Sequence, residues 1–285
     1  MLSGMRDGRI RSRSSEWGLR KSRPAPLARR TNRRWPNVAS PLTRRYKSEL
    51  RRSVVGARCQ EVHARSEPTR WDTAFMASEE SPEGHWNSAY EDKGRTGVSW
   101  YQPAPTMSLS RIDSLQIDPS AGIIDIGGGA SFLTASLLDR GFTDLTVIDI
   151  SKRALELSQA HLGARAAEVT WLHEDLLAWT PSRTYDVWHD RAVFHFLVDP
   201  ASQHKYVELL LAGLAADGIA LFGTFAVDGP PQCSGLPVAH YDAPALGAVL
   251  GSCFVLLDER REEHLTPAGA MQPFSWTTFR RVNAA

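Results

Sequence analysis

Hydrophobic positions divide this chain into two parts. From residue 76 onward, short apolar runs of strand length alternate with segments in which apolar residues recur at helical spacing. Residues 1–75 contain no sustained apolar period. We therefore predict an N-terminal extension over 1–75 and a folded domain over 76–285.

Alternating strands and helices predict an α/β fold built on a parallel sheet. Five apolar runs are predicted strands, the third and fourth running on into a turn and a helix: 122–126, 145–151, 169–176, 185–197 and 219–225. Helical spacing predicts helices over 106–116, 131–140, 152–162, 203–216 and 243–250. Two last runs, 254–259 and 274–281, are joined by a turn and are predicted to end the sheet as an antiparallel hairpin.

Composition and charge support this division. Hydrophobic residues make up 42% of the 285 positions, yet the longest apolar runs fall far short of the roughly 20 residues of a membrane span. We therefore expect no membrane partner. The formal net charge of +1 is the sum of +13 over residues 1–75 and −12 over 76–285. Such asymmetry indicates two segments with different physical properties.

The basic extension is rich in Arg, Ser and Pro, and its low hydrophobicity predicts disorder. It can be a nucleic-acid-binding arm, an organellar transit peptide, or a tail that is not part of the working protein. Few aromatic residues lie among the basic ones, which argues against nucleic acid as a partner. We favour the third interpretation, because Met76 and the residues that follow it resemble the ordinary start of a protein chain. We expect a cytoplasmic protein.

A glycine-rich turn, Gly127–Gly129, separates the first strand from the following helix. Strand, glycine turn and helix form a site for nucleotides, because glycines allow positive φ and close approach of a ligand to the backbone. The dinucleotide fingerprint requires a third glycine where Phe132 stands. The pattern present is D-x-G-x-G-x-S, formed by Asp125, Gly127, Gly129 and Ser131.

Charged residues follow the next three strands. Asp149 ends the second strand, 22 residues after Gly127, close to the spacing of a carboxylate that binds ribose hydroxyls. Ser151 is predicted to cap the helix that comes next. Acids at 174–175 follow the third strand, and His189, Asp190 and Arg191 end the fourth. Open α/β sheets bind ligands at this edge.

Together these motifs resemble the class I (seven-strand) S-adenosylmethionine-dependent methyltransferases, over roughly residues 84–281. The resemblance implies a Rossmann-like sheet of order 3-2-1-4-5-7-6 with a terminal antiparallel hairpin, and S-adenosylmethionine as cofactor. In this family an acid after the third strand binds the adenine amino group, a position that Asp175 fits, with Glu174 as its rival. The cofactor-binding residues implied are Trp100, Asp125, Gly127, Gly128, Gly129, Ser131, Asp149, Ile150, Asp175, Leu176 and His189.

A narrower resemblance lies further toward the N-terminus. His85-Trp86-x-x-x-Tyr90, followed by Ser99-Trp100-Tyr101, is similar to the opening of elongation-factor and citrate-synthase lysine methyltransferases. The segment after the fourth strand differs: it reads H-D-R-A-V-F-H, similar to a broad bacterial methyltransferase group, in place of an E-K-G-T-x-D-type sequence. This aromatic segment, from His85 to Tyr101, is expected to cover the sheet edge, to form a lid over the cofactor, or both.

The predicted function is therefore methyl transfer from S-adenosylmethionine to an unidentified acceptor, a small molecule or a protein side chain. An acceptor that carries a proton needs a base, and His189 and His195 are the candidate catalytic residues. The remaining histidines and the three cysteines show no ligand spacing, so no metal is predicted. Two alternatives remain: a non-catalytic cofactor-binding subunit and a NAD-type oxidoreductase. The oligomeric state is not predicted.

Overall fold

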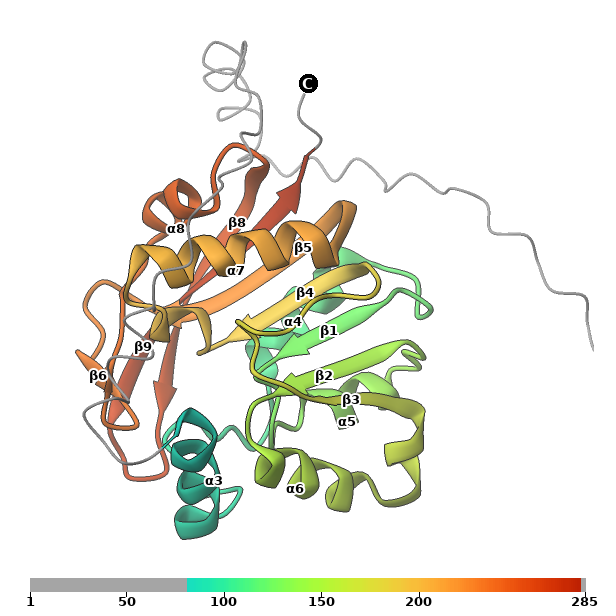
Figure 1. The fold of residues 1–285 in the computed structure, drawn as a ribbon, viewed down its shortest axis with the longest axis vertical. Coiled ribbons are helices and arrows are strands. Elements are labelled where there is room, and N and C mark those ends of the chain that lie inside the picture. Colours follow the sequence, from blue (N-terminus) through green and yellow to red (C-terminus); the bar gives the residue numbers. More distant parts are fainter. Residues whose placement is uncertain (1–80, 283–285) are drawn as a thin grey trace, which may run out of the picture.

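A seven-stranded sheet forms the centre of the molecule (Figure 1). The structure, a computed structural model, describes residues 81–282, so the predicted extension over 1–75 lies outside the described residues. The sheet consists of β1 (Ile123–Ile126), β2 (Leu145–Asp149), β3 (Val169–His173), β4 (Tyr185–Arg191), β5 (Leu214–Phe225), β8 (Phe254–Leu265) and β9 (Met271–Arg281). Its order is β3-β2-β1-β4-β5-β9-β8, and β9 runs antiparallel to both neighbours. The predicted fold class and strand order are confirmed.

Six helices flank the strands of the described chain: α3 (Pro82–Lys93), α4 (Thr106–Leu115), α5 (Leu133–Asp139), α6 (Lys152–Leu162), α7 (Pro200–Gly213) and α8 (Ala243–Leu250). Side-chain oxygens cap four of them by accepting a backbone N–H; the caps are Ser81, Ser151, Asp199 and Asp242. The predicted cap at Ser151 is confirmed. None of the helices within 81–282 has the length and apolar character needed to cross a membrane.

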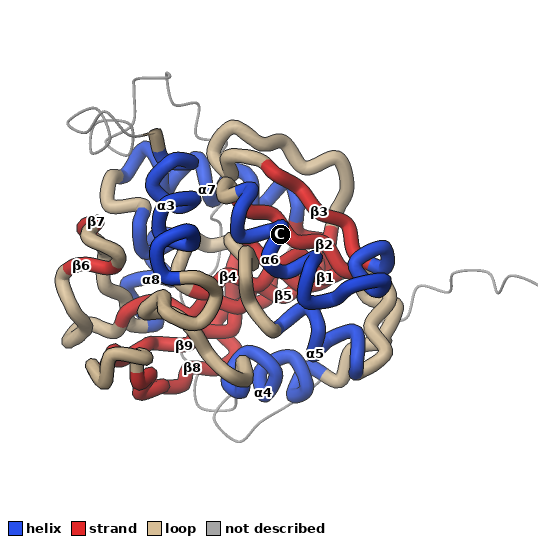
Figure 2. The backbone as a smooth tube through the Cα atoms, turned by 90° about the horizontal axis from the view of Figure 1, so that it is seen from below, coloured by secondary structure: helices blue, strands red, loops and turns tan. Residues whose placement is uncertain are grey.

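Alternation along the strands divides the core between the two faces of the sheet. One face packs under α7 and α8 and includes Ile124, Ile126, Trp188 and Phe222. The other packs against α4 and α5 and includes Ile123, Val147, Val187 and Leu221. In Figure 1, α7 lies in front of the sheet with α4 and α5 behind it, and Figure 2 shows the strands running between the helices.

Several predicted boundaries were wrong, and two of the differences have a clear backbone cause. Helix α7 ends at Gly213 and β5 starts at Leu214, whereas the predicted helix continued to 216. Leu214 already pairs with Tyr185, and Asp217 (φ 61°) then bends the chain into the rest of the strand. After β4 the chain forms only a short 3₁₀ turn, Phe194–Phe196, instead of a helix, because Ala192 has a φ of 67° and turns the backbone sharply.

A buried hydrogen-bond network fastens the end of β4 to α7. The Tyr206 hydroxyl donates to Asp190 Oδ2 at 2.6 Å and accepts from Trp188 Nε1 at 2.8 Å. Backbone N–H groups of Val193 and Phe194 also donate to the Asp190 carboxylate. Burial raises the pKa of Asp190 to about 6, against the lowering effect of these hydrogen bonds. Asp190 thus stabilises the turn that follows β4.

Replacing Tyr206 by Phe should destabilise the protein, because Trp188 Nε1 and Asp190 Oδ2 would each lose a buried partner. We expect a loss of about 1–3 kcal/mol and a fall in Tm of roughly 3–10 °C, measured by thermal denaturation. Tyr241→Phe is the matched control: its hydroxyl accepts only from Gln203 Nε2, which keeps a bond to the Leu197 carbonyl. Equal losses in the two variants would contradict this role of Tyr206.

Candidate active site

The glycine turn after β1 leaves no space for side chains. Gly127 has a φ of 60° and Gly129 a φ of 32°. A Cβ on Gly127 would lie 2.2 Å from Val193 Cγ2, and one on Gly129 would lie 2.6 Å from Asp149 Oδ2. The turn therefore packs directly against the segment after β4 and against the end of β2, and it presents backbone rather than side chains to the neighbouring space.

Arg95 holds the outer side of this turn. Its Nε donates to the Ala130 carbonyl at 2.7 Å and its Nη2 to the Ser131 carbonyl at 2.8 Å. The guanidinium lies 3.7 Å from the centroid of the Phe132 ring. Ser131 Oγ accepts the N–H of Leu133 at the start of α5. Sequence reasoning did not single out Arg95, because nothing in the local pattern links residue 95 to a turn more than thirty positions away.

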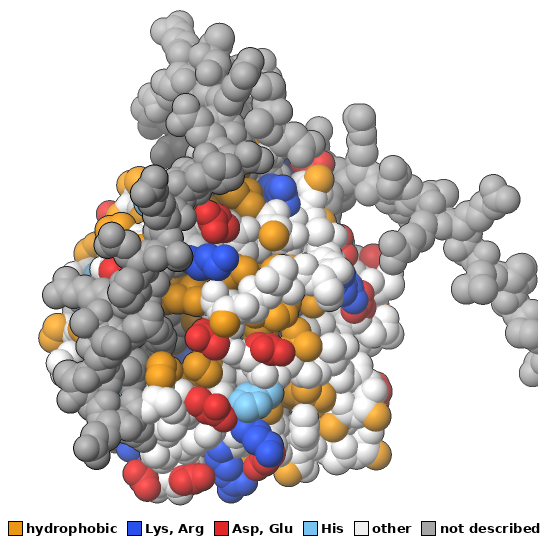
Figure 3. Space-filling view, in the orientation of Figure 1, with side chains coloured by type: hydrophobic (Ala, Val, Ile, Leu, Met, Phe, Trp, Pro, Cys, Tyr) orange, Lys and Arg blue, Asp and Glu red, His pale blue; other side chains and the backbone are white. Residues whose placement is uncertain are grey.

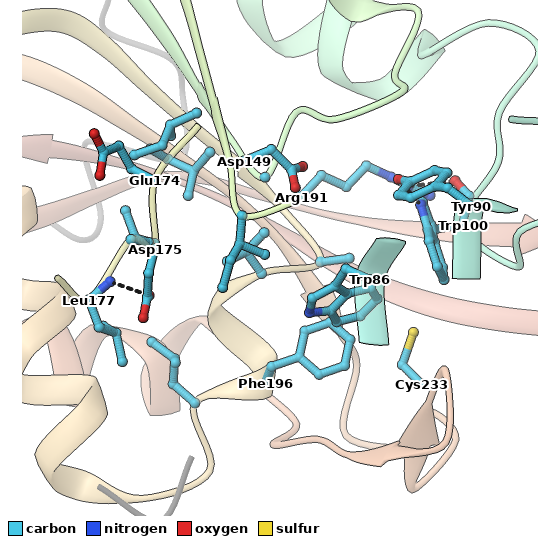
Figure 4. Close-up of a pocket in the computed structure, with 18 residues that line it drawn as sticks. Trp86, Tyr90, Trp100, Asp149, Glu174, Asp175, Leu177, Arg191, Phe196 and Cys233 are labelled. Carbon is cyan, nitrogen blue, oxygen red and sulfur yellow. Dashed lines mark hydrogen bonds between the residues drawn. The ribbon is translucent and has the colours of Figure 1, made fainter. Parts of the chain in front are cut away.

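A cleft opens at the carboxyl ends of β1, β2 and β4, enclosing about 890 Å³ that includes space open to solvent. In Figure 3, hydrophobic and acidic side chains are exposed side by side near the centre of the face that is drawn. Figure 4 shows the cleft from close by. Its lining residues are Trp86, Tyr90, Trp100, Ile126, Gly127, Ile148, Asp149, Ile150, Glu174, Asp175, Leu176, Leu177, Arg191, Ala192, Val193, Phe196, Leu197 and Cys233.

The two predicted acids lie on one side of the cleft. Asp149 Oδ1 accepts the N–H of Ser151 at 2.7 Å. Burial raises the pKa of Asp149 to about 7, and the Asp125 carboxylate acts in the same direction, against hydrogen bonds from the backbone. Asp175 Oδ1 accepts the N–H of Leu177 at 3.0 Å, which fixes the turn after β3 (Figure 4). The turn therefore holds this second carboxylate at the mouth of the cleft.

A second, smaller cavity lies on the other side of the glycine turn. There Asp125 and His189 are register partners on β1 and β4, so their side chains share a face of the sheet. His189 Nδ1 lies 2.7 Å from Asp125 Oδ1, and His189 Nε2 lies 3.0 Å from Ser108 Oγ on α4. Asp125 Oδ2 is buried without a partner. A carboxylate oxygen thus lies beneath the turn with no donor from the described residues.

The structure brings nearly all the predicted cofactor residues to these two cavities. The cleft is lined by Trp100, Gly127, Asp149, Ile150, Asp175 and Leu176. The second cavity is lined by Trp100, Asp125, Gly127, Gly128, Ser131 and His189. Gly129 lines neither and instead contributes a backbone hydrogen bond to Asp149.

His195, predicted as a catalytic candidate, lies elsewhere. Its ring is fully buried between Phe196 and Phe225, and Nδ1 accepts the N–H of Phe225 at 3.3 Å. Burial, together with the positive charge of Arg191, lowers the pKa of His195 to about 3. It lines neither cavity, so its position gives the predicted catalytic role no support.

Aromatic residues from the N-terminal part of the described chain close the cleft. Trp100 Nε1 donates to the Tyr90 hydroxyl at 3.0 Å. Trp86 meets Trp100 and Phe196 edge to face, with ring centroids 5.6 and 5.1 Å apart. This segment therefore forms one wall of the cleft. Its action as a lid over the cofactor stays a prediction. Among residues 81–282, no three His, Cys, Asp or Glu side chains are arranged to hold a metal ion.

Comparisons with known proteins agree with this geometry. The family model described as "Methyltransferase domain" matches residues 123–218. The eEF1A lysine and N-terminal methyltransferase of Mus musculus is 24% identical over 166 residues, covering 57% of this chain and 22% of that protein. EEF1A lysine methyltransferase 2 of Danio rerio is 33% identical over 92 residues, covering 30% and 40%. The chain spans less than half the length of these relatives.

Solved structures share the fold. The 1,6-didemethyltoxoflavin-N1-methyltransferase of Burkholderia thailandensis, bound to 1,6-didemethyltoxoflavin and S-adenosylhomocysteine, superposes with a TM-score of 0.59 at 21% identity, covering 78% of this chain and 94% of that one. The N-methyltransferase NodS of Bradyrhizobium japonicum, also with S-adenosylhomocysteine, gives 0.52 at 16% identity, covering 68% and 97%. The matched family model identifies residues 123–218 as a methyltransferase domain, and the confirmed strand order and these likenesses show that it has the class I fold.

Proposed function

We propose that this protein transfers a methyl group from S-adenosylmethionine to an acceptor bound at the aromatic end of the cleft. The observation that carries the proposal is the meeting of three separate motifs at one opening. The glycine turn after β1, Asp149 after β2 and Asp175 after β3 all border it. The acceptor, like the cytoplasmic location, remains a prediction.

The residues present fit the two polar parts of the cofactor. The side-chain-free turn at Gly127–Gly129 lets the methionine half approach the backbone, and the unpartnered Asp125 Oδ2 suits its ammonium group. Asp149 would accept hydrogen bonds from the ribose hydroxyls, with Asp175 near the adenine. When bound, the cofactor supplies a methyl group already activated on a sulfonium, so the protein needs mainly to align the acceptor and exclude water.

The chain's own residues support alignment better than proton removal. Trp86, Trp100 and Phe196 give the cleft an apolar wall, which would help to exclude water once the cofactor and acceptor are bound. None of the lining residues within 81–282 is a histidine. His189 is engaged at both ring nitrogens, by Asp125 and Ser108, which gives it a positioning role beneath the glycine turn. This arrangement favours an acceptor that needs no histidine base in contact with it.

Two measurements on the full chain test the proposal. Isothermal titration with S-adenosylhomocysteine should show saturable binding, and absence of binding at millimolar ligand would refute it. Methyl-labelled S-adenosylmethionine incubated with a metabolite and protein extract should label an acceptor. Cofactor binding without any labelled product would support the non-catalytic subunit, and tighter binding of NADH would support the oxidoreductase.

Gly127→Ala should weaken S-adenosylhomocysteine binding by more than about tenfold, equivalent to about 1.4 kcal/mol. The new methyl group would meet Val193 at 2.2 Å and push the turn away from the cleft. Gly141→Ala separates this effect from backbone strain, since Gly141 also has positive φ (84°) but a Cβ added there would meet no atom within 4 Å. Both variants should lose stability in thermal denaturation, but only Gly127→Ala should lose affinity in calorimetry.

Binding of S-adenosylhomocysteine should strengthen as pH rises through about 7. The pKa of Asp149 is raised to about 7, so below that pH its carboxyl holds a proton and loses acceptor capacity for the ribose hydroxyls. The affinity should change by up to tenfold per pH unit below the pKa and level off above it. Asp149→Asn should bind weakly with a flatter profile between pH 6 and 8, and an unchanged slope in this variant would assign the titration to another group.

A further inference from the structure

Arg191 lies at the junction of the two cavities and has a largely unused guanidinium. It lines both cavities, at the end of β4. Nη1 donates to the Trp100 carbonyl at 3.0 Å, while Nε and Nη2 are buried and have no hydrogen-bond partner within residues 81–282. The Phe274 ring packs against it, with its centroid 4.7 Å from Cζ. The unpaired Nε–Nη2 edge is the one that binds a carboxylate or phosphate through two parallel hydrogen bonds.

The nearest acids of the described chain, Glu262 and Asp125, form no salt bridge with Arg191. The negative charge of Glu262 stabilises the charged form of Arg191. Its two oxygens, however, accept from Gln102 Nε2 at 2.8 Å and from Trp276 Nε1 at 2.7 Å. Asp125 is bonded to His189 through Oδ1. Arg191 therefore lacks the paired carboxylate that a buried guanidinium ordinarily has.

Charge is distributed unevenly along the cleft. Asp149, Glu174 and Asp175 lie at the β2–β3 side, whereas Arg191 lies toward Trp100, Cys233 and the aromatic wall (Figure 4). The Arg191 charge also contributes to lowering the pKa of His195 and of His264, after burial in both cases. Among the described residues that line the cleft, Arg191 is the one cation, and the three acids lie toward the cofactor side.

From this distribution we infer that the methyl acceptor carries an anionic group, a carboxylate or phosphate on an apolar body, which pairs with the Nε–Nη2 edge of Arg191. The inference rests on the proposed function and specifies its substrate class. Because Nε and Nη2 are shielded from solvent in this structure, pairing requires the side chain to turn toward the cleft and release the Trp100 carbonyl. A positively charged lysine acceptor would instead meet repulsion at this end.

Three probes of similar size test the charge preference on the full chain saturated with S-adenosylhomocysteine: benzoate, benzamide and benzylamine. Ligand-observed NMR titration should give a dissociation constant for benzoate at least about tenfold below those of the neutral and cationic probes. Equal binding of the three, or tightest binding of benzylamine, would overturn the inference. This titration uses the unaltered protein, so its result does not depend on whether a variant folds.

Arg191→Met should reduce the preference for benzoate to within about threefold, while S-adenosylhomocysteine affinity changes by less than about threefold. Arg183→Met is the control, since Arg183 is exposed and pairs with Asp144 away from the cleft. A loss of S-adenosylhomocysteine affinity above about tenfold in Arg191→Met, with benzoate preference kept, would show that Arg191 holds the cofactor instead.

The two levels of proposal fail in different ways. If the unaltered chain does not bind S-adenosylhomocysteine, the proposed function is wrong. If it binds S-adenosylhomocysteine but shows no preference for benzoate, only the anionic-acceptor inference is wrong.

Discussion

The parallel pairing of β1 with β4 determines the rest of the site. In this register Asp125 lies beside His189, and both side chains point to the face covered by α4, where Ser108 completes the hydrogen-bonded row. A shift of one residue in either strand would turn its carboxylate or its imidazole toward the apolar face under α7. The same pairing brings the glycine turn against Val193, so the two loops that border the cleft support each other.

The three residues that end β4 form contacts on both faces of the sheet. His189 faces α4 and the second cavity, Asp190 faces Tyr206 on α7, and Arg191 reaches the cleft. The left-handed backbone of Ala192 then turns the chain away. A non-glycine residue at positive φ is strained, and the buried bonds to Asp190 on the following N–H groups hold it in place.

The segment before β1 completes the site from a distance. Asn87 Oδ1 accepts from Ser151 Oγ and from the N–H of Arg153, which ties α3 to the start of α6. Arg95 fastens the glycine turn from outside, and Tyr90 binds Trp100 within the cleft. These polar contacts explain why a helix with few buried residues is held against α6, and why the cleft has an aromatic wall.

By itself the sequence determined the fold class and the motif positions, and the resemblance of these motifs to class I methyltransferases implied the strand order. Strand and helix periods differ, and acids after buried strands must lie at one edge of a parallel sheet. Tertiary structure decided which polar groups meet. Neither Asp125 with His189 nor Arg95 with the Ala130 carbonyl follows from local pattern, because strand register and packing bring them together. The free edge of Arg191 and the burial of His195 depend on neighbours that are remote in sequence, such as Phe274 and Phe225.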